Sequence, residues 1–490
     1  MKRKNAAWLF LLAMLLLIAA ISSCGDDDDD DDSAQETDDD DSINDDDSAP
    51  QDDDDTSADD DDAVDAEKEA LKQRLWDEAL DVFEANRVES EFGLFHLPSS
   101  ETYRAFFAWD SGWNVIALSL LDPESAYEEL ATIFSFQTED GRIPHEVLIP
   151  GLEETDPIRI ISKFFVRRQY DDQGRSRFID PPSFLIAAEI LYRHSGDERI
   201  LTLLPAMEAC VDYLLGPRDL FGDGLVSIIH PWESGTDSAP VFDEPMGIDI
   251  SNPLVFIDYL IKYPTLLNSY ANQNWDLDQI AQTNRFVFED VGLNGLTAAG
   301  LMSMATLYDE AGKPDDADRC RQRAQAMITT METVLWDDQL GFFYPHYDLE
   351  TPKVPQRRSI TGLAPLITGL VDEEIALRLI EDGLLSDDHF SGPHPVPFNS
   401  ISEIEDHIPM EGTLLWRGHC IWINMNWIAA RVAATYGYDT LAREITLATA
   451  EMVDREGFRE FYDSRTGEGD GANLFTWPAL VLDMIEEHGL

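Results

Sequence analysis

The chain of 490 residues is strongly acidic, with 97 Asp and Glu against 34 Lys and Arg and a formal net charge of −63. This excess disfavours nucleic-acid binding, because phosphate recognition needs clustered Lys and Arg. Apart from Cys24, the cysteines are Cys210, Cys320 and Cys420, and their spacing matches no zinc or redox motif. We therefore expect buried thiols at these three positions.

The first 24 residues have the pattern of an export signal. Met1 to Lys4 carries three positive charges, an apolar run of about 16 residues follows, and Ser22-Ser-Cys24 ends it. The stretch before Cys24 resembles a bacterial lipobox, in which the cysteine becomes the lipidated first residue. We predict a lipoprotein signal over 1–24 and membrane attachment through Cys24, in the periplasm or at the cell surface. An ordinary signal peptide or a short membrane anchor are the alternatives.

Residues 25–62 form a segment of very low complexity, with 22 Asp and one Glu. Such a segment has almost nothing to bury, so we predict a disordered, self-repelling linker. Residues 63–490 still carry a charge of −43, which predicts an acidic surface on the folded part. A saline habitat is one explanation for such a surface.

Helical periodicity dominates residues 63–490, and no second linker divides them. The strand signals are short, at 224–229 and 341–344, and there is neither a βαβ alternation nor a glycine-rich phosphate loop. We therefore predict one all-α domain over 63–490. The expected helices cover 66–85, 113–121, 126–136, 182–194, 198–215, 253–272, 276–288, 296–311, 314–335, 365–384, 415–436, 439–453 and 474–488.

A domain of this many helices fits either a superhelical solenoid or a closed toroid of paired helices. The sequence shows no fixed repeat of helical-solenoid length, which argues against the solenoid. In a toroid, the long connections would gather at one end and line a pocket.

Five loops combine aromatic rings with carboxylates or amides, a composition suited to sugars: 103–113, 136–145, 230–240, 411–422 and 458–471. Each also has a purely structural explanation. Asp110 can cap a helix, Gln137 can end one, and Arg417 can form a salt bridge beside a buried ring. In the loop His230-Pro-Trp-Glu-Ser-Gly-Thr-Asp237, proline and glycine rule out a helix interior.

The motifs together resemble the inverting glycoside hydrolases of family 63, which share an (α/α)6 toroid with trehalases and glucoamylases. The specific pieces are HPWESGTD at 230–237, WRG at 416–418, EFYDSRTGEGDG at 460–471 and Phe475-Thr-Trp477. The resemblance implies hydrolysis of a small carbohydrate or glycoside, without metal or cofactor. An inverting glycosidase needs one protonated and one ionised carboxyl about 6.5–9.5 Å apart.

The resemblance also assigns residues. Asp237 becomes the general acid and Glu460 the general base, whereas Glu233 is expected to be structural or to bind a sugar hydroxyl. The implied sugar-binding residues are Tyr103, Phe107, Trp109, Asp110, Gln137, Trp232, Glu411, Trp416 and Arg417.

The chain departs from the family pattern at several positions. Ser238 follows the acid where Asn is common, and Leu415 and His419 flank Trp-Arg-Gly in place of an aromatic residue and Pro. No clear basic pair follows Asp243, where a glycerate carboxylate would need an arginine. These departures disfavour a glycerate glycoside and leave α-glucosides, α-mannosides and trehalose-like sugars as substrates.

Three other functions remain possible on the sequence. The first is a sugar-binding lipoprotein that keeps the toroid without turnover. The second is a trehalase-like hydrolase. The third is a polysaccharide lyase, which an acidic pocket disfavours because it repels acidic polymers. The sequence makes no prediction of the oligomeric state.

Overall fold

The structure is a computed structural model that describes residues 57–152, 157–252, 255–404 and 415–490. It comprises two compact units. The larger consists of Lys68–Glu153 and Val166–Leu490, and the smaller includes the described parts of Met1–Glu67 and Glu154–Phe165. The predicted signal, Cys24, most of the acidic linker and Glu411 lie outside the described residues.

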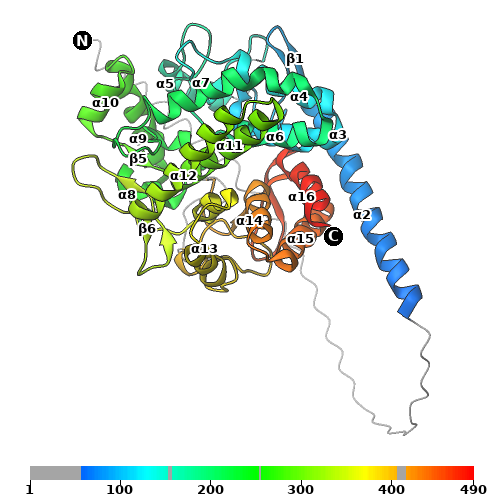
Figure 1. Cartoon of the computed structure of the whole chain (residues 1–490). Coiled ribbons are helices and arrows are strands. Elements are labelled where there is room, and N and C mark those ends of the chain that lie inside the picture. Colours follow the sequence, from blue (N-terminus) through cyan, green and yellow to red (C-terminus); the bar gives the residue numbers. More distant parts are fainter. Residues whose placement is uncertain (1–56, 153–156, 253–254, 405–414) are drawn as a thin grey trace, which may run out of the picture. The chain divides into compact units, whose positions relative to one another are not determined.

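Helices make up most of the described chain, as the periodicity predicts (Figure 1). The α-helices are α2 (Ser57–Asn86), α3 (Ala108–Leu121), α4 (Pro123–Ser135), α5 (Pro157–Val166), α6 (Ser183–Ser195), α7 (Leu204–Leu215), α8 (Asp243–Met246), α9 (Val255–Asn272), α10 (Leu277–Thr283), α11 (Val291–Glu310), α12 (Pro314–Val334), α13 (Glu373–Leu379), α14 (Ile423–Thr435), α15 (Asp439–Glu456) and α16 (Val481–His488). Short 3-10 helices are η1 (Arg167–Gln169), η2 (Glu198–Leu203), η3 (Pro231–Ser234), η4 (Pro240–Phe242), η5 (Ile360–Thr368), η7 (Ile401–Glu403) and η8 (Trp477–Leu480), and η6 (Ile380–Leu384) is a π-helix.

The contacts between helices of the larger unit close into a ring. In chain order, α3 packs on α6, α6 on α11, α11 on η5 and η5 on α14; α14 then packs on α16, which returns to α3. Further helices cover this ring: α4 lies on α3, α12 on α11 and α15 on α14. A closed ring of paired helices agrees with the expected toroid rather than a solenoid. The division into six hairpins stays a prediction.

The strands are short and pair segments of the chain that lie between helices. They are β1 (Arg87–Ser90), β2 (Gly93–His96), β3 (Phe106–Phe107), β4 (Glu146–Val147), β5 (Phe288–Glu289), β6 (Trp336–Asp337), β7 (Phe342–Phe343), β8 (His346–Tyr347), β9 (Cys420–Ile421), β10 (Arg459–Asp463) and β11 (Gly469–Asn473). All ladders between these strands are antiparallel, and the three-stranded sheet has the order β11-β10-β9. This sheet brings the segment after Trp-Arg-Gly beside the EFYD segment, because Tyr462 pairs with Ile421.

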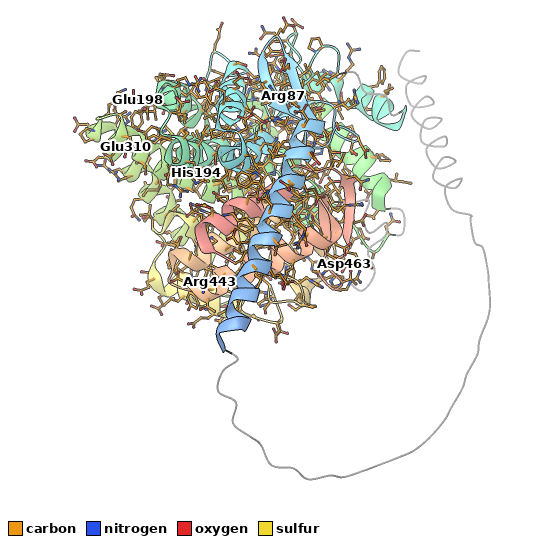
Figure 2. The ribbon with its side chains drawn as sticks, turned by 90° about the vertical axis from the view of Figure 1, so that its right-hand side faces the viewer. Arg87, His194, Glu198, Glu310, Arg443 and Asp463 are labelled. Atoms are coloured by element: carbon orange, nitrogen blue, oxygen red, sulfur yellow. The ribbon has the colours of Figure 1, made fainter. Side chains whose placement is uncertain are left out.

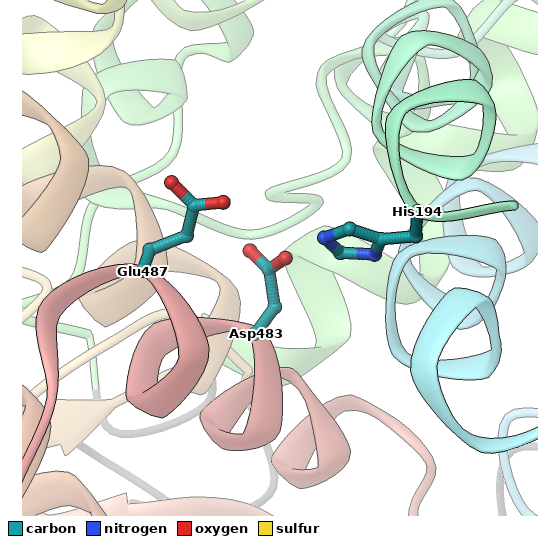
Figure 3. A group of neighbouring side chains, drawn as sticks. All are labelled: His194, Asp483 and Glu487. Atoms are coloured by element: carbon teal, nitrogen blue, oxygen red, sulfur yellow. The ribbon is translucent and has the colours of Figure 1, made fainter. Parts of the chain in front are cut away.

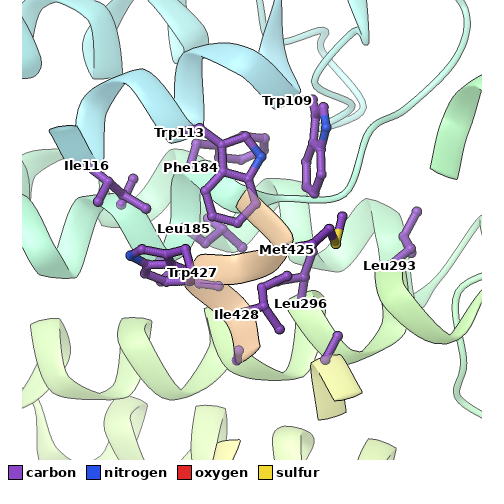
Figure 4. Close-up of a cluster of buried hydrophobic side chains, with 14 of the residues drawn as sticks. Trp109, Trp113, Ile116, Phe184, Leu185, Leu293, Leu296, Met425, Trp427 and Ile428 are labelled. Carbon is purple, nitrogen blue, oxygen red and sulfur yellow. The ribbon is translucent and has the colours of Figure 1, made fainter. Parts of the chain in front are cut away.

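The core lies between the inner helices, which are apolar on nearly all sides (Figure 4). Trp113 of α3 and Trp427 of α14 meet edge to face with ring centroids 5.4 Å apart, and both are fully buried. Close packing of α3 on α6 requires a glycine, since a Cβ at Gly112 would lie 2.0 Å from Ser183 Oγ. The first turns of two ring helices are therefore held together directly beside the aromatic loop.

Several expected elements differ from the structure. Residues 224–229 form no strand and make one bridge, Ile228 to Phe288. Helix α14 begins at Ile423 rather than 415, because Trp416 (φ 65°) and Gly418 (φ 66°) turn the chain into β9 first. Helix α2 begins at Ser57, six residues inside the predicted linker. Helix α5 was not predicted.

The remaining sequence predictions on composition can be checked directly. Cys210, Cys320 and Cys420 are buried free thiols, as expected. Charged residues such as Glu198, Glu310 and Arg443 are exposed on the larger unit (Figure 2). Among the described residues, no helix combines the length and apolar character needed to span a bilayer.

Candidate active site

One cavity in the larger unit brings together residues from all five loops singled out in the sequence. The space between its walls, including open solvent at the mouth, is about 530 Å³. Its lining consists of Pro98, Tyr103, Phe107, Trp109, Asp110, His145, Asp180, Trp232, Gly235, Asp237, Leu415, Trp416, Trp422, Glu460, Phe475 and Trp477. Both predicted catalytic carboxyls and six of the predicted sugar-binding residues are therefore in the wall of one cavity.

The loop 230–240, which contains Asp237 and is called the acid loop below, is shaped by a single 3-10 turn, Pro231–Ser234. His230 Nδ1 accepts the backbone N–H of Trp232, and Gly235 ends the turn at φ 71°, a conformation that favours glycine. A Cβ at Gly235 would lie 2.8 Å from the ring of Trp109. The chain then places Asp237 in the cavity, where Tyr263 Oη donates to its carbonyl at 2.8 Å.

Glu233 has the structural role expected of it. Its carboxylate pairs with the buried guanidinium of Arg218 and accepts the N–H groups of Ile179 at 3.0 Å and Ile229 at 2.6 Å. Both side chains of the ion pair are at most 1% exposed. Glu233 thus anchors the loop from behind, while Asp237, four residues later, faces the cavity.

Asp237 is poised to hold a proton near neutral pH. Burial raises its pKa to about 7; a hydrogen bond with its own backbone opposes the rise, and the negative charge of Glu460 adds to it. No Lys or Arg of the described residues forms an ion pair with its carboxylate. A carboxyl with such a pKa can donate a proton to a leaving oxygen at neutral pH.

Glu460 is held by donors. It lies on β10, is 5% exposed, and its Oε2 accepts the backbone N–H of Ala472 at 2.8 Å. The hydroxyl of Tyr103 donates to Oε1. Donors on both oxygens favour the charged form of a carboxylate, which is the form that a base requires.

Two further carboxyls, Asp110 and Asp180, lie in the cavity wall. Asp180 Oδ2 accepts the N–H of Trp109 at 3.1 Å, so it holds the first turn of α3. Burial raises the pKa of both groups well above the usual range, and the charges of neighbouring carboxylates raise it further. Asp110 is not the cap of α3, because the helix begins at Ala108 with Phe107 as its N-cap; Asp110 lies in the first turn and its side chain lines the cavity.

Aromatic rings form the other walls. Trp416 stacks on Trp422 with centroids 3.7 Å apart, and Trp477 lies 5.7 Å from Trp422. Trp109 meets Trp477 edge to face at 6.3 Å. Trp232 lines the side of the acid loop. Ring faces of this kind suit the apolar faces of a pyranose.

Two predicted sugar-binding residues lie elsewhere. Gln137 lines a separate cavity, and its amide N–H groups bond to the carbonyls of Gly141 at 2.9 Å and Ala206 at 2.8 Å, so it ties the turn at Gly141 to the first turn of α7. Arg417 is 4% exposed and does not line the cavity, since its guanidinium is bound to Asp243 and the hydroxyl of Tyr259. Glu411 is outside the described residues.

Sequence reasoning assigned no role to several lining residues, among them Asp180, His145, Trp422 and Phe475. Burial lowers the pKa of His145 to about 4, so the ring is neutral at pH 7. Asp180 precedes the Pro-Pro pair that begins α6, a signal that the sequence offers at a helix start. Trp477 and Phe475 belong to a quoted motif, which marks them in the sequence without a function.

Comparisons with known proteins identify relatives over most of the chain. Residues 103–478 match the family described as the mannosylglycerate hydrolase MGH1-like glycoside hydrolase domain. The mannosylglycerate hydrolase of Thermus thermophilus is 27% identical over 414 residues, which are 79% of this chain and 96% of that protein. The glucosylglycerate hydrolase of Mycolicibacterium hassiacum is 24% identical over 433 residues, 81% of this chain and 95% of that protein.

The architecture has a solved counterpart as well. The crystal structure of the family 63 mannosylglycerate hydrolase from Thermus thermophilus in complex with glucose has a TM-score of 0.69 at 26% identity. The match covers 84% of this chain and 100% of that one. The chain is therefore a glycoside hydrolase and belongs to the mannosylglycerate hydrolase MGH1-like members of family 63.

Proposed function

We propose that this hydrolase is an exo-acting, inverting glycosidase of small α-glucosides or α-mannosides, with Asp237 as general acid and Glu460 as general base. The observation that carries the proposal is the contrast between the two carboxyls in one cavity. Asp237 has a pKa of about 7 and no cationic partner among the described residues, whereas Glu460 is fixed by two donors.

The reaction follows from these states. Asp237 gives its proton to the glycosidic oxygen as the bond to the anomeric carbon breaks. Glu460 takes a proton from a water that attacks the opposite face, so the configuration inverts. The tryptophans exclude bulk water and stack on the sugar, and Asp110 bonds to its hydroxyls. A pocket rather than a long groove suits a terminal sugar.

The charge of the cavity favours an uncharged substrate. Its described lining contains four carboxyls and neither Lys nor Arg. Arg417 is already bound to Asp243. An anionic aglycone such as glycerate would find no Lys or Arg in the described lining to pair with, so neutral disaccharides, including trehalose-like ones, fit better.

The N-terminal sequence supports an exported, lipid-anchored enzyme. The charged start, the apolar run and Cys24 are the features of a lipoprotein signal, and the acidic linker would hold the catalytic domain away from the membrane. Labelling with a radioactive fatty acid in a bacterial host, with Cys24→Ser as control, tests this. Label retained in the Ser variant, or absent from both proteins, contradicts the anchor.

The test of the activity is hydrolysis of a panel followed by proton NMR. The panel contains nigerose, kojibiose, trehalose, mannobiose, glucosylglycerate and mannosylglycerate. We expect the β-anomer to appear first from a neutral substrate, and Asp237→Asn and Glu460→Gln to abolish it. The matched control is Asp249→Asn, an exposed carboxylate outside the cavity, which should keep full activity.

A second function has one supporting observation, the dense aromatic lining, which binding proteins share. On this alternative the chain is a tethered sugar-binding lipoprotein. Binding of a panel sugar without release of any product would favour it over hydrolysis. Preferential cleavage of mannosylglycerate or glucosylglycerate would instead contradict the argument from charge while keeping the enzyme.

A further inference from the structure

A second group of chemically active side chains lies far along the same helices from the catalytic cavity. His194 is in the last turn of α6, and Asp483 and Glu487 are on α16; we call these three residues the His194 cluster (Figure 3). One ligand-capable atom from each residue lies within 4.8 Å of the others. The cavity, in contrast, is built from the first turn of α3 and the residues before α6.

Two contacts of Ser119 favour one neutral form of the His194 ring. Ser119 Oγ lies 2.6 Å from the carbonyl of Ile116, which can only accept a hydrogen bond. With the hydroxyl hydrogen on that carbonyl, the contact of 2.7 Å between His194 Nδ1 and Ser119 Oγ takes its hydrogen from Nδ1. In the neutral imidazole, Nε2 then holds a lone pair, and Figure 3 shows the ring edge directed at Asp483.

In the carboxylates of Asp483 and Glu487, one oxygen has a hydrogen-bond or ion-pair partner and the other oxygen is available to a ligand. Asp483 Oδ2 accepts from Trp427 Nε1 at 2.7 Å and lies 3.6 Å from Arg431 Nη1. Asp483 Oδ1 is fully buried without a hydrogen-bond partner in the described structure. Glu487 Oε1 pairs with Arg193, which leaves Oε2.

One atom from each of the three side chains thus converges on the others, and Asp483 adds a buried carboxylate whose Oδ1 has no hydrogen-bond partner in the described structure. A buried oxygen without a partner is costly, and a cation held between the carboxylates and the imidazole would satisfy it.

We propose that the His194 cluster is a structural site for one divalent transition-metal ion of the zinc type. One imidazole nitrogen and two carboxylate oxygens are common zinc ligands. The hydrogen bonds that join the second atom of each ligand to Ser119, Trp427 and Arg193 are the outer contacts that orient ligands in metal sites. The ion would connect α6 to α16, where the last helix of the ring meets the earlier ones.

Two features determine how strongly the cluster would bind a metal ion: the spacing of its ligand atoms and the positive charges nearby. Around a tetrahedral zinc, ligand atoms lie about 3.4 Å apart, given bonds of about 2.0–2.2 Å. The cluster must therefore contract at its widest pair, and Glu487, exposed in the last turn of α16, can move. Arg193 and Arg431 contribute positive charge nearby, but each is paired with one oxygen of a carboxylate, Glu487 Oε1 and Asp483 Oδ2, which leaves the other oxygen for the metal.

The experiment uses the full chain, stripped with a chelator and dialysed against zinc chloride. We expect one zinc per chain by elemental analysis and a higher midpoint of thermal unfolding with zinc than without. His194→Gln and Glu487→Gln should each weaken zinc binding by about tenfold or more and remove the thermal shift. Glu486→Gln, the adjacent exposed carboxylate on α16, is the matched control and should keep both.

The same measurements can overturn the proposal. Failure of the wild-type chain to retain stoichiometric zinc would do so. Equal zinc binding by wild type and both variants would also do so, because the ion would then be held elsewhere, for example by the Asp-rich residues 25–62. Glu487→Gln decides the question even if His194→Gln does not fold, since Glu487 is exposed. Glycosidase activity does not enter the readout.

Discussion

The two ends of α3 and α6 have carboxyl groups in opposite settings. Beside their first turns, Asp110 and Asp180 are buried, and within the described structure neither forms an ion pair with Lys or Arg; burial raises the pKa of each. Beside their last turns, burial raises the pKa of Glu487, but the bond and charge of Arg193 outweigh it and lower the pKa overall. Asp483 has Arg431 at 3.6 Å, whose charge opposes the rise in pKa that burial causes there.

This difference separates carboxyls that can exchange protons from carboxyls that hold elements of the same fold in place. Carboxyls without cationic partners can gain and lose protons near neutral pH, which is what a glycosidase requires. Arginine beside a carboxyl favours its charged form, which holds elements in place. The acid loop repeats the contrast over four residues, since Glu233 is paired with Arg218 and Asp237 faces the cavity. Substitutions on either side should therefore fail in different ways.

The largest expected effect is on turnover. Asp237→Asn should lower kcat by about 10²–10⁴-fold, because proton donation to the leaving oxygen is lost. The thermal unfolding midpoint should not fall, since no ion pair is broken. Measuring both on one preparation tests the contrast, and a loss of stability as large as that of Glu233→Gln would contradict it.

Glu233→Gln should act on the fold instead. Removing one charge leaves the guanidinium of Arg218 buried without its partner, which costs about 3–5 kcal/mol of unfolding free energy. Denaturant unfolding measures the change. Asp258→Asn, which breaks an exposed pair with Lys262, is the control and should cost less than about 1 kcal/mol. Equal effects of the two substitutions would show that Arg218 finds another partner.

The raised pKa of Asp237 predicts the pH dependence of both properties. The folded-state pKa is about 7 and the ordinary value 3.8, so the folded protein holds this proton more tightly. Its contribution to stability is complete below about pH 4 and is lost as the pH rises to 7, on the order of 1–3 kcal/mol. Asp237→Asn should therefore be more stable than wild type at pH 8 but not at pH 4. Wild-type activity should fall above pH 7.

Much of this arrangement could be predicted from the sequence, and the limits have physical causes. Periodicity located most of the ring helices, and the residues selected from the motifs include Asp237, Glu460, Trp109, Trp232 and Trp416, which all line the cavity, whereas Trp422 and Trp477 were given no role. Asp180 could not be found, because only the N–H of Trp109, 71 positions earlier, shows where it lies. The apolar run from Leu415 continues a helical pattern, yet Trp416 at φ 65° delays α14 until Ile423.

Gln137 and the His194 cluster illustrate the same limit. The sequence does not show whether the amide of a polar residue at a helix end faces a sugar or two carbonyls. For Gln137, the carbonyl of Ala206, 69 positions away, determines where the amide lies. His194 and Asp483 are even further apart in the chain, and ring closure alone brings them together. Pairing with arginine, which separates structural from reactive carboxyls, is therefore a property of the fold.

The smallest expected effect concerns the hydroxyl that Tyr103 donates to the base. Tyr103→Phe removes the hydroxyl that bonds to Glu460 Oε1 but keeps the ring against Phe107 and Phe475. Glu460 would still accept from Ala472, so kcat should fall only about tenfold, the equivalent of one hydrogen bond to a charged group. KM should change little, because the stacking surface is retained.

The matched control for this substitution is Tyr347→Phe, which removes a similar bond of 2.8 Å to Glu244 outside the cavity. It should leave kcat and KM at their wild-type values, because Glu244 takes no part in the reaction. If both substitutions left kcat unchanged, Tyr103 would be a wall of the sugar site. The difference between reactive and structural carboxyls would then rest on the arginines rather than on this hydroxyl.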